Sequence, residues 1–247
     1  MSTDKVLIEE NNKVLTLTIN RPQARNALDF ETYEALAQAL DSTHGRDDLH
    51  AIILTGAANY FTAGNDLRDF QKTPGAISPG ITFLESLHKV KIPVIAAVEG
   101  GAVGIGVTLL MHCDFVYAAE NVFFQIPFVP LGLCPEGASS VLMAQYVGIR
   151  TANEWLYRGK PFTAEQAFDK GFISAVTTAG QALQAAQELA NEMSQQSLLS
   201  LKTTKQLIKR QMAPIIEETF RVERDSFVKC LQSPEAQAAF AHFLNKK

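Results

Sequence analysis

Short apolar segments alternate with helical patterns up to about residue 180, and only helical patterns follow them. The segments predicted as strands are residues 5–8, 14–19, 51–54, 93–98, 115–118, 122–124 and 173–176. The segments predicted as helices are residues 30–40, 81–90, 107–112, 136–146, 163–171 and those from 181 onward. Strands that alternate with helices typically build a parallel sheet covered by helices. The order therefore predicts an α/β fold with a helical region at its C-terminus.

A chain of 247 residues can bury a core without disulfides or metal ions, and it fits one large domain or one domain with an appendage. We place the division at residue 195, with a core over residues 1–195 and a helical region over residues 196–247. The apolar residues of the second region, among them Leu199 and Leu207, need a surface to cover. That surface is either the core or another subunit.

Charge and hydropathy exclude several classes of protein. The net charge of −4, from 22 basic and 26 acidic residues, indicates no site for nucleic acid or an anionic membrane. No run of about 18 apolar residues predicts a membrane-spanning helix, and the first residues do not have the pattern of a secretion signal. Three widely spaced cysteines form no Cys-x-x-Cys pair, as is usual in a reducing compartment. We therefore expect a cytoplasmic protein.

The motifs of several common chemistries are missing. Gly100, Gly101, Gly104 and Gly106 do not have the Gly-x-Gly-x-x-Gly spacing of a dinucleotide site, and no phosphate-binding P-loop motif occurs. The five histidines form neither His-x-His nor His-Glu-x-x-His, so no metal site is expected. No Gly-x-Ser-x-Gly sequence indicates a serine hydrolase.

Two glycine-containing loops each lead from a predicted strand toward a helix. The first runs over residues 61–67, and the second contains Gly104 and Gly106. Glycine lets the backbone approach a ligand closely, and the first N–H groups of a helix have no partner within it. Two such loops that face each other could hold an oxyanion between one N–H group from each. Spacing alone leaves open that both are ordinary turns.

A third feature is Glu136, which follows Pro135 at the predicted start of a helix. An acidic residue there complements the helix dipole, which is one interpretation of Glu136. The other is a carboxylate directed into an apolar pocket as a general base. A helix N-terminus would lower the pKa of Glu136 and an apolar pocket would raise it, so the sequence leaves its direction open.

These features occur together, in the same order, in one family. Over essentially its whole length the chain resembles the crotonase superfamily of enoyl-CoA hydratases and isomerases. The resemblance rests on Asn20-Arg21-Pro22, Asn26-Ala27-Leu28 and residues 61–67, 100–114, 127–140 and 163–171. It implies a spiral of ββα units, a C-terminal helical region that builds trimers, and acyl-CoA thioesters as substrates.

The resemblance also assigns site residues. It implies that the backbone N–H groups of Asn65 and Ile105 hold the thioester oxygen. The residues implied to contact coenzyme A or substrate are Ala24, Arg25, Ala63, Gly64, Asn65, Asp66, Leu67 and Gly104. The cation expected at the coenzyme A phosphates is Arg25, ahead of Arg68, Lys72, Lys246 and Lys247. Coenzyme A enters as part of the substrate, so no separate cofactor is expected. The expected assembly is a homotrimer or a dimer of trimers.

Departures from the family pattern bear on the reaction. Hydratases of this family carry one glutamate on the helix after the glycine turn and another ahead of the third loop, where this chain has Thr108 and Phe128. Neither side chain can supply the proton transfers that adding water to a double bond requires. The motifs around Asn65, Thr108 and Glu136 are similar instead to the peroxisomal-type 3-enoyl-CoA to 2-enoyl-CoA isomerases. Their catalytic glutamate matches Glu136, although the peroxisomal Ser-Lys-Leu tail is absent.

Moving a double bond needs only one base. The resemblance therefore implies that Glu136 takes a proton from C2 and returns it at C4, in fatty-acid degradation. Phe128, Val129, Leu131 and Leu133 are predicted to form an apolar wall that excludes water. Two alternatives stay open, a 2-enoyl-CoA hydratase and an acyl-CoA-binding protein without catalysis.

Overall fold

Six strands form the main sheet, in the order β1-β2-β3-β4-β6-β9. The computed structural model describes residues 4–72 and 79–244. β1 and β2 form an antiparallel hairpin, and each later pair in this sheet is parallel. Its strands are β1 (Val6–Asn11), β2 (Val14–Ile19), β3 (Ala51–Gly56), β4 (Val94–Val98), β6 (Phe115–Ala119) and β9 (Ala175–Thr177). Parallel neighbours require crossover segments, and those after β3 and β4 carry the two glycine loops.

A second, smaller sheet has the order β5-β7-β8. Its strands are β5 (Gly101–Val103), β7 (Phe123–Gln125) and β8 (Phe162–Thr163). The sequence analysis predicts neither β5 nor β8, because β5 lies in a glycine-rich segment that has the composition of a turn. Gly101 lets the side chains of Phe123 and Tyr60 pack on the strand, since a Cβ atom there would lie 2.7 Å from the ring of Phe123. The second sheet therefore fixes the path of the chain into the second glycine loop.

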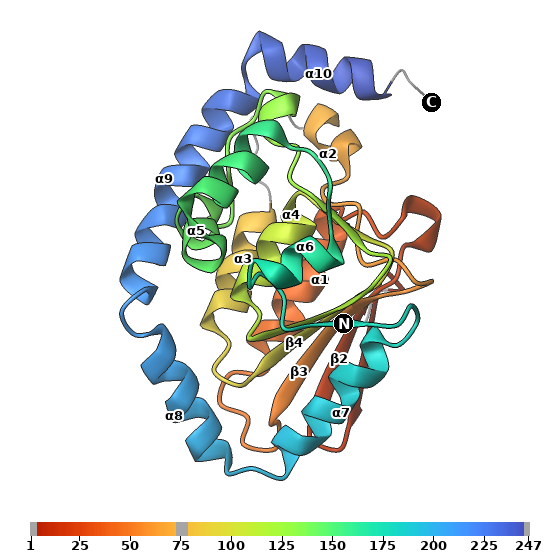
Figure 1. The fold of residues 1–247 in the computed structure, drawn as a ribbon, viewed down its shortest axis with the longest axis vertical. Coiled ribbons are helices and arrows are strands. Elements are labelled where there is room, and N and C mark those ends of the chain that lie inside the picture. Colours follow the sequence, from red (N-terminus) through yellow and green to blue (C-terminus); the bar gives the residue numbers. More distant parts are fainter. Residues whose placement is uncertain (1–3, 73–78, 245–247) are drawn as a thin grey trace.

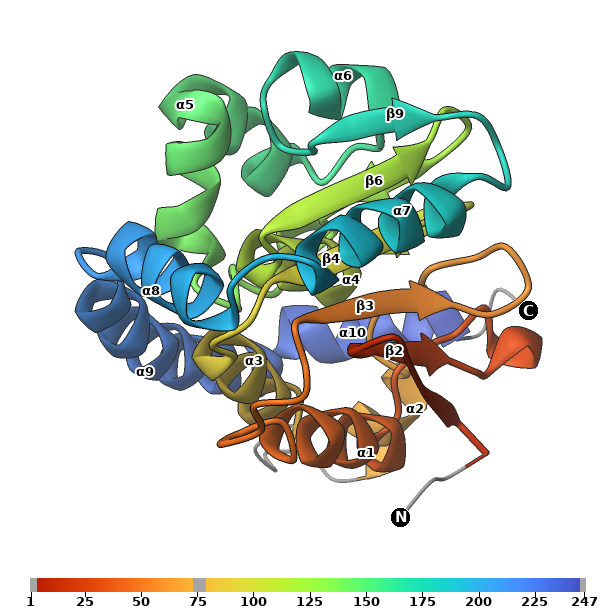
Figure 2. The ribbon, with the colours of Figure 1, turned by 90° about the horizontal axis from the view of Figure 1, so that it is seen from below.

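Helices cover both faces of the main sheet (Figures 1 and 2). α7 (Ala182–Ser194) lies on one face and brings Ala182, Ala186 and Ala190 against a cluster that includes Ile53 and Ile95. Small residues on that stripe let the helix approach the sheet closely. The alternate residues Ile52 and Leu54 point to the opposite face, because successive strand residues do so. α1 (Phe30–Asp41) and α3 (Pro79–Lys89) share the main core on that side.

The remaining helices complete the covering of the core and form the C-terminal region. They are α2 (Leu67–Lys72), α4 (Ile105–Thr108), α5 (Ser139–Arg158), α6 (Ala164–Asp169), α8 (Leu198–Lys209), α9 (Ala213–Leu231) and α10 (Pro234–Leu244), with the 3-10 helices η1 (Pro22–Ala24), η2 (Leu109–His112) and η3 (Val129–Leu131). α8, α9 and α10 follow one another along the outside of the core (Figure 1). The predicted α/β fold with a helical C-terminal region is confirmed. The division at residue 195 falls between α7 and α8 and stays a prediction.

None of the described helices has the length and apolar character needed to span a bilayer.

Local end signals agree with the predictions for two helices. Asp29 caps α1 by accepting a hydrogen bond from the backbone N–H of Thr32. Thr163 and Gln166 form the predicted capping box at the start of α6.

Other predicted helix limits are wrong. The helix predicted from Glu136 begins at Ser139, because Gly137 and Ala138 have φ values of 71° and 59°, which no right-handed helix accommodates. Gly148, by contrast, interrupts the helical backbone as predicted, with φ 74° and ψ 153°, and a second helical stretch continues from there to Arg158. The helix predicted over residues 107–112 is one α-helical turn, α4, followed by η2.

Candidate active site

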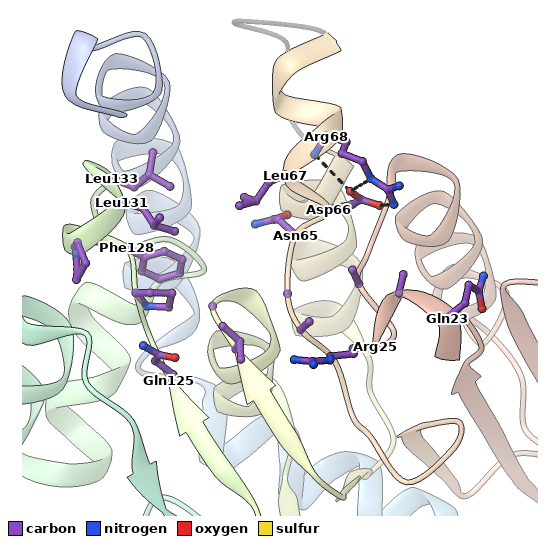
Figure 3. Close-up of a pocket in the computed structure, with 18 residues that line it drawn as sticks. Gln23, Arg25, Asn65, Asp66, Leu67, Arg68, Gln125, Phe128, Leu131 and Leu133 are labelled. Carbon is purple, nitrogen blue, oxygen red and sulfur yellow. Dashed lines mark hydrogen bonds and ion pairs between the residues drawn. The ribbon is translucent and has the colours of Figure 1, made fainter. Parts of the chain in front are cut away.

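A cavity of about 680 Å³ opens between the first glycine loop and the segment around η3 (Figure 3). Asn65 and Leu67 lie on one side, and Phe128, Leu131 and Leu133 lie on the other. The predicted coenzyme A and substrate contacts all line it: Ala24, Arg25, Ala63, Gly64, Asn65, Asp66, Leu67 and Gly104. Val129 is the exception among the predicted wall residues. It is not part of the lining and is 42% exposed, so this prediction is wrong.

The two glycine loops are packed against each other. Thr62 and Ala102 form a parallel β-bridge between them. Gly64 has a φ of 84°, and a Cβ atom on it would lie 2.5 Å from the carbonyl oxygen of Val103. Only glycine combines that backbone conformation with so close an approach. The structure therefore brings together two loops that are far apart in the sequence and sets them at one edge of the cavity.

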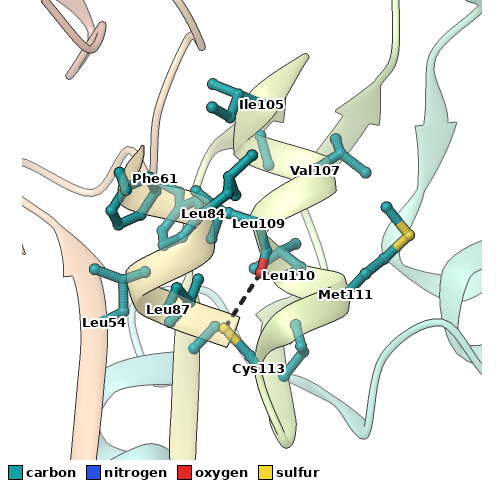
Figure 4. Packing of buried hydrophobic residues seen from close by; sticks show 14 of the residues in the cluster. Leu54, Phe61, Leu84, Leu87, Ile105, Val107, Leu109, Leu110, Met111 and Cys113 are labelled. Atoms are coloured by element: carbon teal, nitrogen blue, oxygen red, sulfur yellow. Dashed lines mark hydrogen bonds between the residues drawn. The ribbon is translucent and has the colours of Figure 1, made fainter. Parts of the chain in front are cut away.

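Each loop leaves one backbone N–H group unpaired. The neighbours of Asn65 bond to Leu28 on one side, through the carbonyl of Gly64 and the N–H of Asp66, so the N–H of Asn65 points to the other side. Ile105 is the first residue of α4, and its side chain is anchored in the core near Leu84 (Figure 4). Within the described residues neither N–H group has an acceptor. Two unpaired donors of this kind can stabilise an oxyanion.

Glu136 is buried behind the cavity. It is 7% exposed, it is not part of the cavity lining, and its Oε1 atom has no hydrogen-bond partner among the described residues. Burial, together with the negative charge of Glu223, raises the pKa of Glu136 to about 8. The apolar surroundings therefore outweigh the helix N-terminus that follows. A carboxylate with these properties is a strong base once it is ionised.

Tyr33 connects Glu136 with the wall of the cavity. Its hydroxyl group donates a hydrogen bond of 2.6 Å to the side-chain oxygen of Asn65, which lines the cavity. Burial raises the pKa of Tyr33, and the charge of Glu136 raises it further, so the two side chains interact electrostatically. Tyr33 therefore stays neutral and donates to Asn65.

The turn that carries Glu136 is held by two residues that the sequence analysis does not place in the site. His112 Nε2 lies 2.8 Å from the carbonyl oxygen of Gly137, and burial lowers the pKa of His112 to about 3, so the neutral ring donates this bond. Glu223, on α9, accepts hydrogen bonds from the backbone N–H groups of Ala138 and Ser140. No local motif predicts Glu223, because it lies 85 residues from Ala138.

The two positions where related hydratases carry glutamates hold inert side chains. Thr108 is fully buried, and its hydroxyl lies 3.4 Å from the carbonyl oxygen of Ile105. Phe128 packs edge-on against Phe227, with ring centroids 6.4 Å apart. Neither can exchange a proton with substrate.

The cations at the cavity mouth differ in what they bind. Arg68 forms hydrogen bonds and an ion pair with Asp66. Arg68 and then Arg21 hold the pKa of the Asp66 carboxyl well below its usual range, so this carboxylate is neutralised by partners rather than free to act as a base. Arg25 is exposed and has no ion-pair or hydrogen-bond partner for its side chain within the described ranges. Lys246 and Lys247 lie outside the described residues.

In the described part of the chain, no group of three or more His, Cys, Asp and Glu side chains is placed to hold a metal ion.

The sequence and fold are similar to those of known proteins. A family model described as enoyl-CoA hydratase/isomerase matches residues 9–247. The chain is 30% identical over 249 residues to 2,3-dehydroadipyl-CoA hydratase of Escherichia coli (strain K12), which covers 98% of this chain and 96% of the relative. It is 34% identical over 179 residues to enoyl-CoA delta isomerase 2 of Rattus norvegicus, which covers 69% of this chain and 46% of that relative. The solved structure of an enoyl-CoA hydratase/isomerase from Acinetobacter baumannii has a TM-score of 0.90 at 40% identity and covers 96% of this chain and 100% of the other.

Proposed function

The chain belongs to the enoyl-CoA hydratase/isomerase family, the crotonase superfamily, and from that membership we propose that it is a 3,2-enoyl-CoA isomerase. It converts 3-enoyl-CoA to 2-trans-enoyl-CoA in fatty-acid degradation. The observation that carries the proposal is the buried carboxylate of Glu136, which acts on Tyr33, the hydrogen-bond partner of Asn65, while Thr108 and Phe128 stand at the two positions that match the hydratase glutamates. Moving a double bond needs one base, whereas hydration needs a group that activates water and a group that delivers a proton.

In the proposed mechanism Glu136 removes a proton from C2 of the bound thioester. The electrons move into a dienolate, whose negative charge develops on the thioester oxygen. The N–H groups of Asn65 and Ile105 stabilise that charge, and losing one such donor typically costs about 3 kcal/mol of barrier. The protonated Glu136 then donates the proton at C4. Phe128, Leu131 and Leu133 keep water from the intermediate.

Arg25 is proposed to bind the phosphates of coenzyme A, because its guanidinium group is exposed at the cavity and unpaired within the described residues. Coenzyme A is part of the substrate, and no separate cofactor is required by a one-base reaction. We propose a cytoplasmic homotrimer or dimer of trimers, in which residues 1–195 bind and convert substrate and residues 196–247 join the subunits.

A 2-enoyl-CoA hydratase is the second candidate, because curated relatives such as the protein from Escherichia coli carry hydratase names. This chain would need another acid in place of the two missing glutamates. Asp66 is poorly suited to that task, since Arg68 and Arg21 hold it as an ion-paired carboxylate. The ratio of isomerisation to hydration separates the two candidates.

The test is to give the purified chain 3-enoyl-CoA and 2-enoyl-CoA separately and to identify the products by mass spectrometry. We expect 2-enoyl-CoA from the first substrate and at least ten-fold slower hydration of the second. Glu136→Gln is expected to lower isomerisation by about 10³-fold, within the range of general-base contributions. The matched control is Glu217→Gln, an exposed carboxylate on α9, which should keep native activity.

Three results would contradict the proposal. Hydration faster than isomerisation would indicate a hydratase. Thioester binding without any turnover would indicate a binding protein. Near-native isomerisation by Glu136→Gln would eliminate Glu136 as the base.

A further inference from the structure

Glu136 stands at the head of a turn that needs outside support. Gly137 and Ala138 both have left-handed φ values, and for Ala138, which has a Cβ atom, that conformation is strained. Ala138 is also the N-cap residue of α5, and its side chain cannot accept a hydrogen bond from the first turn of the helix. The segment that places Glu136 therefore lacks the local features that usually hold a helix start.

Glu223 supplies what the turn lacks. Its Oε2 atom accepts the N–H of Ala138 at 2.6 Å, and its Oε1 atom accepts the N–H of Ser140 at 2.9 Å. Glu223 is 6% exposed and comes from the middle of α9. A buried carboxylate thus replaces the missing cap from 85 residues away. Its position at the N-terminus of α5 also suits a negative charge.

The same face of α9 supports the turn a second time. Phe220, one helical turn before Glu223, stacks on His112 with ring centroids 5.4 Å apart. His112 in turn bonds the carbonyl oxygen of Gly137. The peptide group that joins the left-handed pair is therefore held at both ends, its Gly137 carbonyl by His112, on which Phe220 stacks, and its Ala138 N–H by Glu223.

We propose that Glu223 is a positioning residue for the reaction of Glu136, holding its turn in place and, as an ionised neighbour, strengthening Glu136 as a base. The kinetic part of this inference rests on the proposed function. Its structural part, the effect of one carboxylate on the other, does not.

Ionisation of Glu223 follows from its partners. Burial raises the pKa of Glu223 overall, and the bonds from Ser140 and Ala138, which use both oxygens as acceptors, offset part of that rise. Glu136, by contrast, has an oxygen without any partner in the described part of the chain. When two carboxyl groups share a buried region, the one that accepts more hydrogen bonds ionises first and the other is held protonated to higher pH. Glu223 is the first to ionise here.

Burial holds four titratable side chains around the pair in their neutral forms. Burial raises the pKa of Tyr33, on α1, well above its usual value, and lowers the pKa of His112, on η2, to about 3. Burial also lowers the pKa of His88, on α3, to about 4 and raises the pKa of Cys134, in the loop before Glu136, to about 12. Among the described residues Glu223 is therefore the charged group that acts on Glu136.

The test uses Glu223→Gln, which keeps the shape of the side chain and removes its charge. ¹³C NMR of chains labelled at the glutamate carboxyl carbon follows the titration of Glu136, with the signal assigned from Glu136→Gln. We expect the apparent pKa of Glu136 to fall by about one unit in Glu223→Gln, because a like charge has been removed. Glu217→Gln removes an exposed charge from the same helix and should leave the titration unchanged.

The kinetic arm measures kcat and KM for isomerisation across pH. In a plot of kcat against pH, the rising part of the curve should move to lower pH by about one unit in Glu223→Gln. The plateau of kcat should fall about ten-fold with KM nearly unchanged, because the base is less well placed. Glu223→Asp keeps the charge on a shorter side chain. The pH at which kcat rises should therefore match the wild type, and the maximal kcat should fall less than in Glu223→Gln.

The outcomes separate this inference from the proposed function. If Glu136 titrates alike in the wild type and Glu223→Gln, the inference is overturned, even when the variant unfolds at lower temperature, since a purely structural role would do that. If the titration shifts but the wild type isomerises no 3-enoyl-CoA, the coupling of the two carboxylates stands and the proposed function fails.

Discussion

The side chain of Glu136 combines two properties that rarely meet in a protein core. It is ionisable, and one of its oxygens is buried without a partner in the described residues. Burial destabilises the charged form of such a group. The ionised carboxylate of Glu136 is therefore a stronger base toward a proton on carbon. Burial of Glu136 thus lowers the stability of the folded chain and raises the basicity of this carboxylate.

The stability cost of Glu136 depends on pH. Its pKa is about 8 in the folded chain against 4.5 for the free side chain, so the folded state retains a proton that the unfolded state releases between these values. The stabilising contribution of the neutral group is therefore complete below pH 4.5 and is lost as pH rises through about 8. Relative to the wild type, Glu136→Gln should gain about 3–5 kcal/mol of unfolding free energy between pH 4.5 and 8.5.

Urea unfolding at several pH values measures this gain. Glu217→Gln is the control and should follow the wild type at every pH, since that residue is exposed. A difference between Glu136→Gln and wild type that is independent of pH would show that Glu136 is not held protonated by burial.

Single residues of the site differ in how far the sequence predicts them. Gly64 and Gly104 could be identified from the loops, because both have a positive φ and Gly64 also approaches the backbone of Val103 closely. Glu136 could be singled out only with the family resemblance, since the residues alone also fit an ordinary helix-start acid. Glu223 could not be found, because its partners are backbone N–H groups that any residue provides.

At the scale of elements, the site depends on contacts between segments that are remote in the chain. η2 supports the turn after Glu136 through His112, and α9 supports it through Phe220 and Glu223. These contacts explain why the start of α5 lies three residues later than predicted. The left-handed pair before Ser139 is stable only because other elements bond its backbone groups.

His112→Phe tests this support. The substitution keeps a ring beside Phe220 but leaves the buried carbonyl of Gly137 without its donor. We expect a loss of about 1–3 kcal/mol in unfolding free energy and a fall of about ten-fold in kcat. Chemical unfolding and steady-state kinetics measure the two effects.

Thr55→Val is the matched control for that variant, because the buried Thr55 hydroxyl also donates to a backbone carbonyl, that of Ala97 in the main sheet. It should lose stability and keep kcat. Equal kcat in both variants and the wild type would show that His112 only stabilises the fold.

Prediction of the elements succeeded where periodicity is strong. The strands β2, β3, β4 and β6 and the helices α1 and α3 follow from apolar spacing, because each buries several apolar side chains. β5 and β8 could not be predicted, since strands of three and two residues are fixed by pairing rather than by their own pattern. The contact of the two glycine loops is likewise set by the sheet order and not by either loop.

At the scale of the whole molecule, the helical C-terminal region leaves apolar side chains exposed in the isolated chain. Leu199, Leu207 and Ile208, on α8, are 76%, 62% and 75% exposed. Burying them against another copy of the chain would be favourable. We therefore predict a particle of about three times the 27.0 kDa chain mass, or twice that number for a dimer of trimers.

Sedimentation equilibrium tests this assembly. Ile208→Glu should shift the mass toward that of a single chain, because it places a charge in the contact. Gln206→Glu adds a charge at an exposed polar position of α8 and should leave the assembly intact. A wild-type chain that sediments as a monomer at all concentrations would contradict the predicted trimer.

The central claim is that one buried carboxylate carries the same hydrogen from C2 to C4. It is tested most directly with 3-enoyl-CoA that bears deuterium at C2, converted in ordinary water and analysed by mass spectrometry at early times. Because Glu136 is 7% exposed, its captured deuteron should exchange slowly with solvent. We predict that a substantial share of the 2-enoyl-CoA carries deuterium at C4. Product that gains only solvent hydrogen at C4, however early it is sampled, would contradict the claim, because a second group would then deliver the proton.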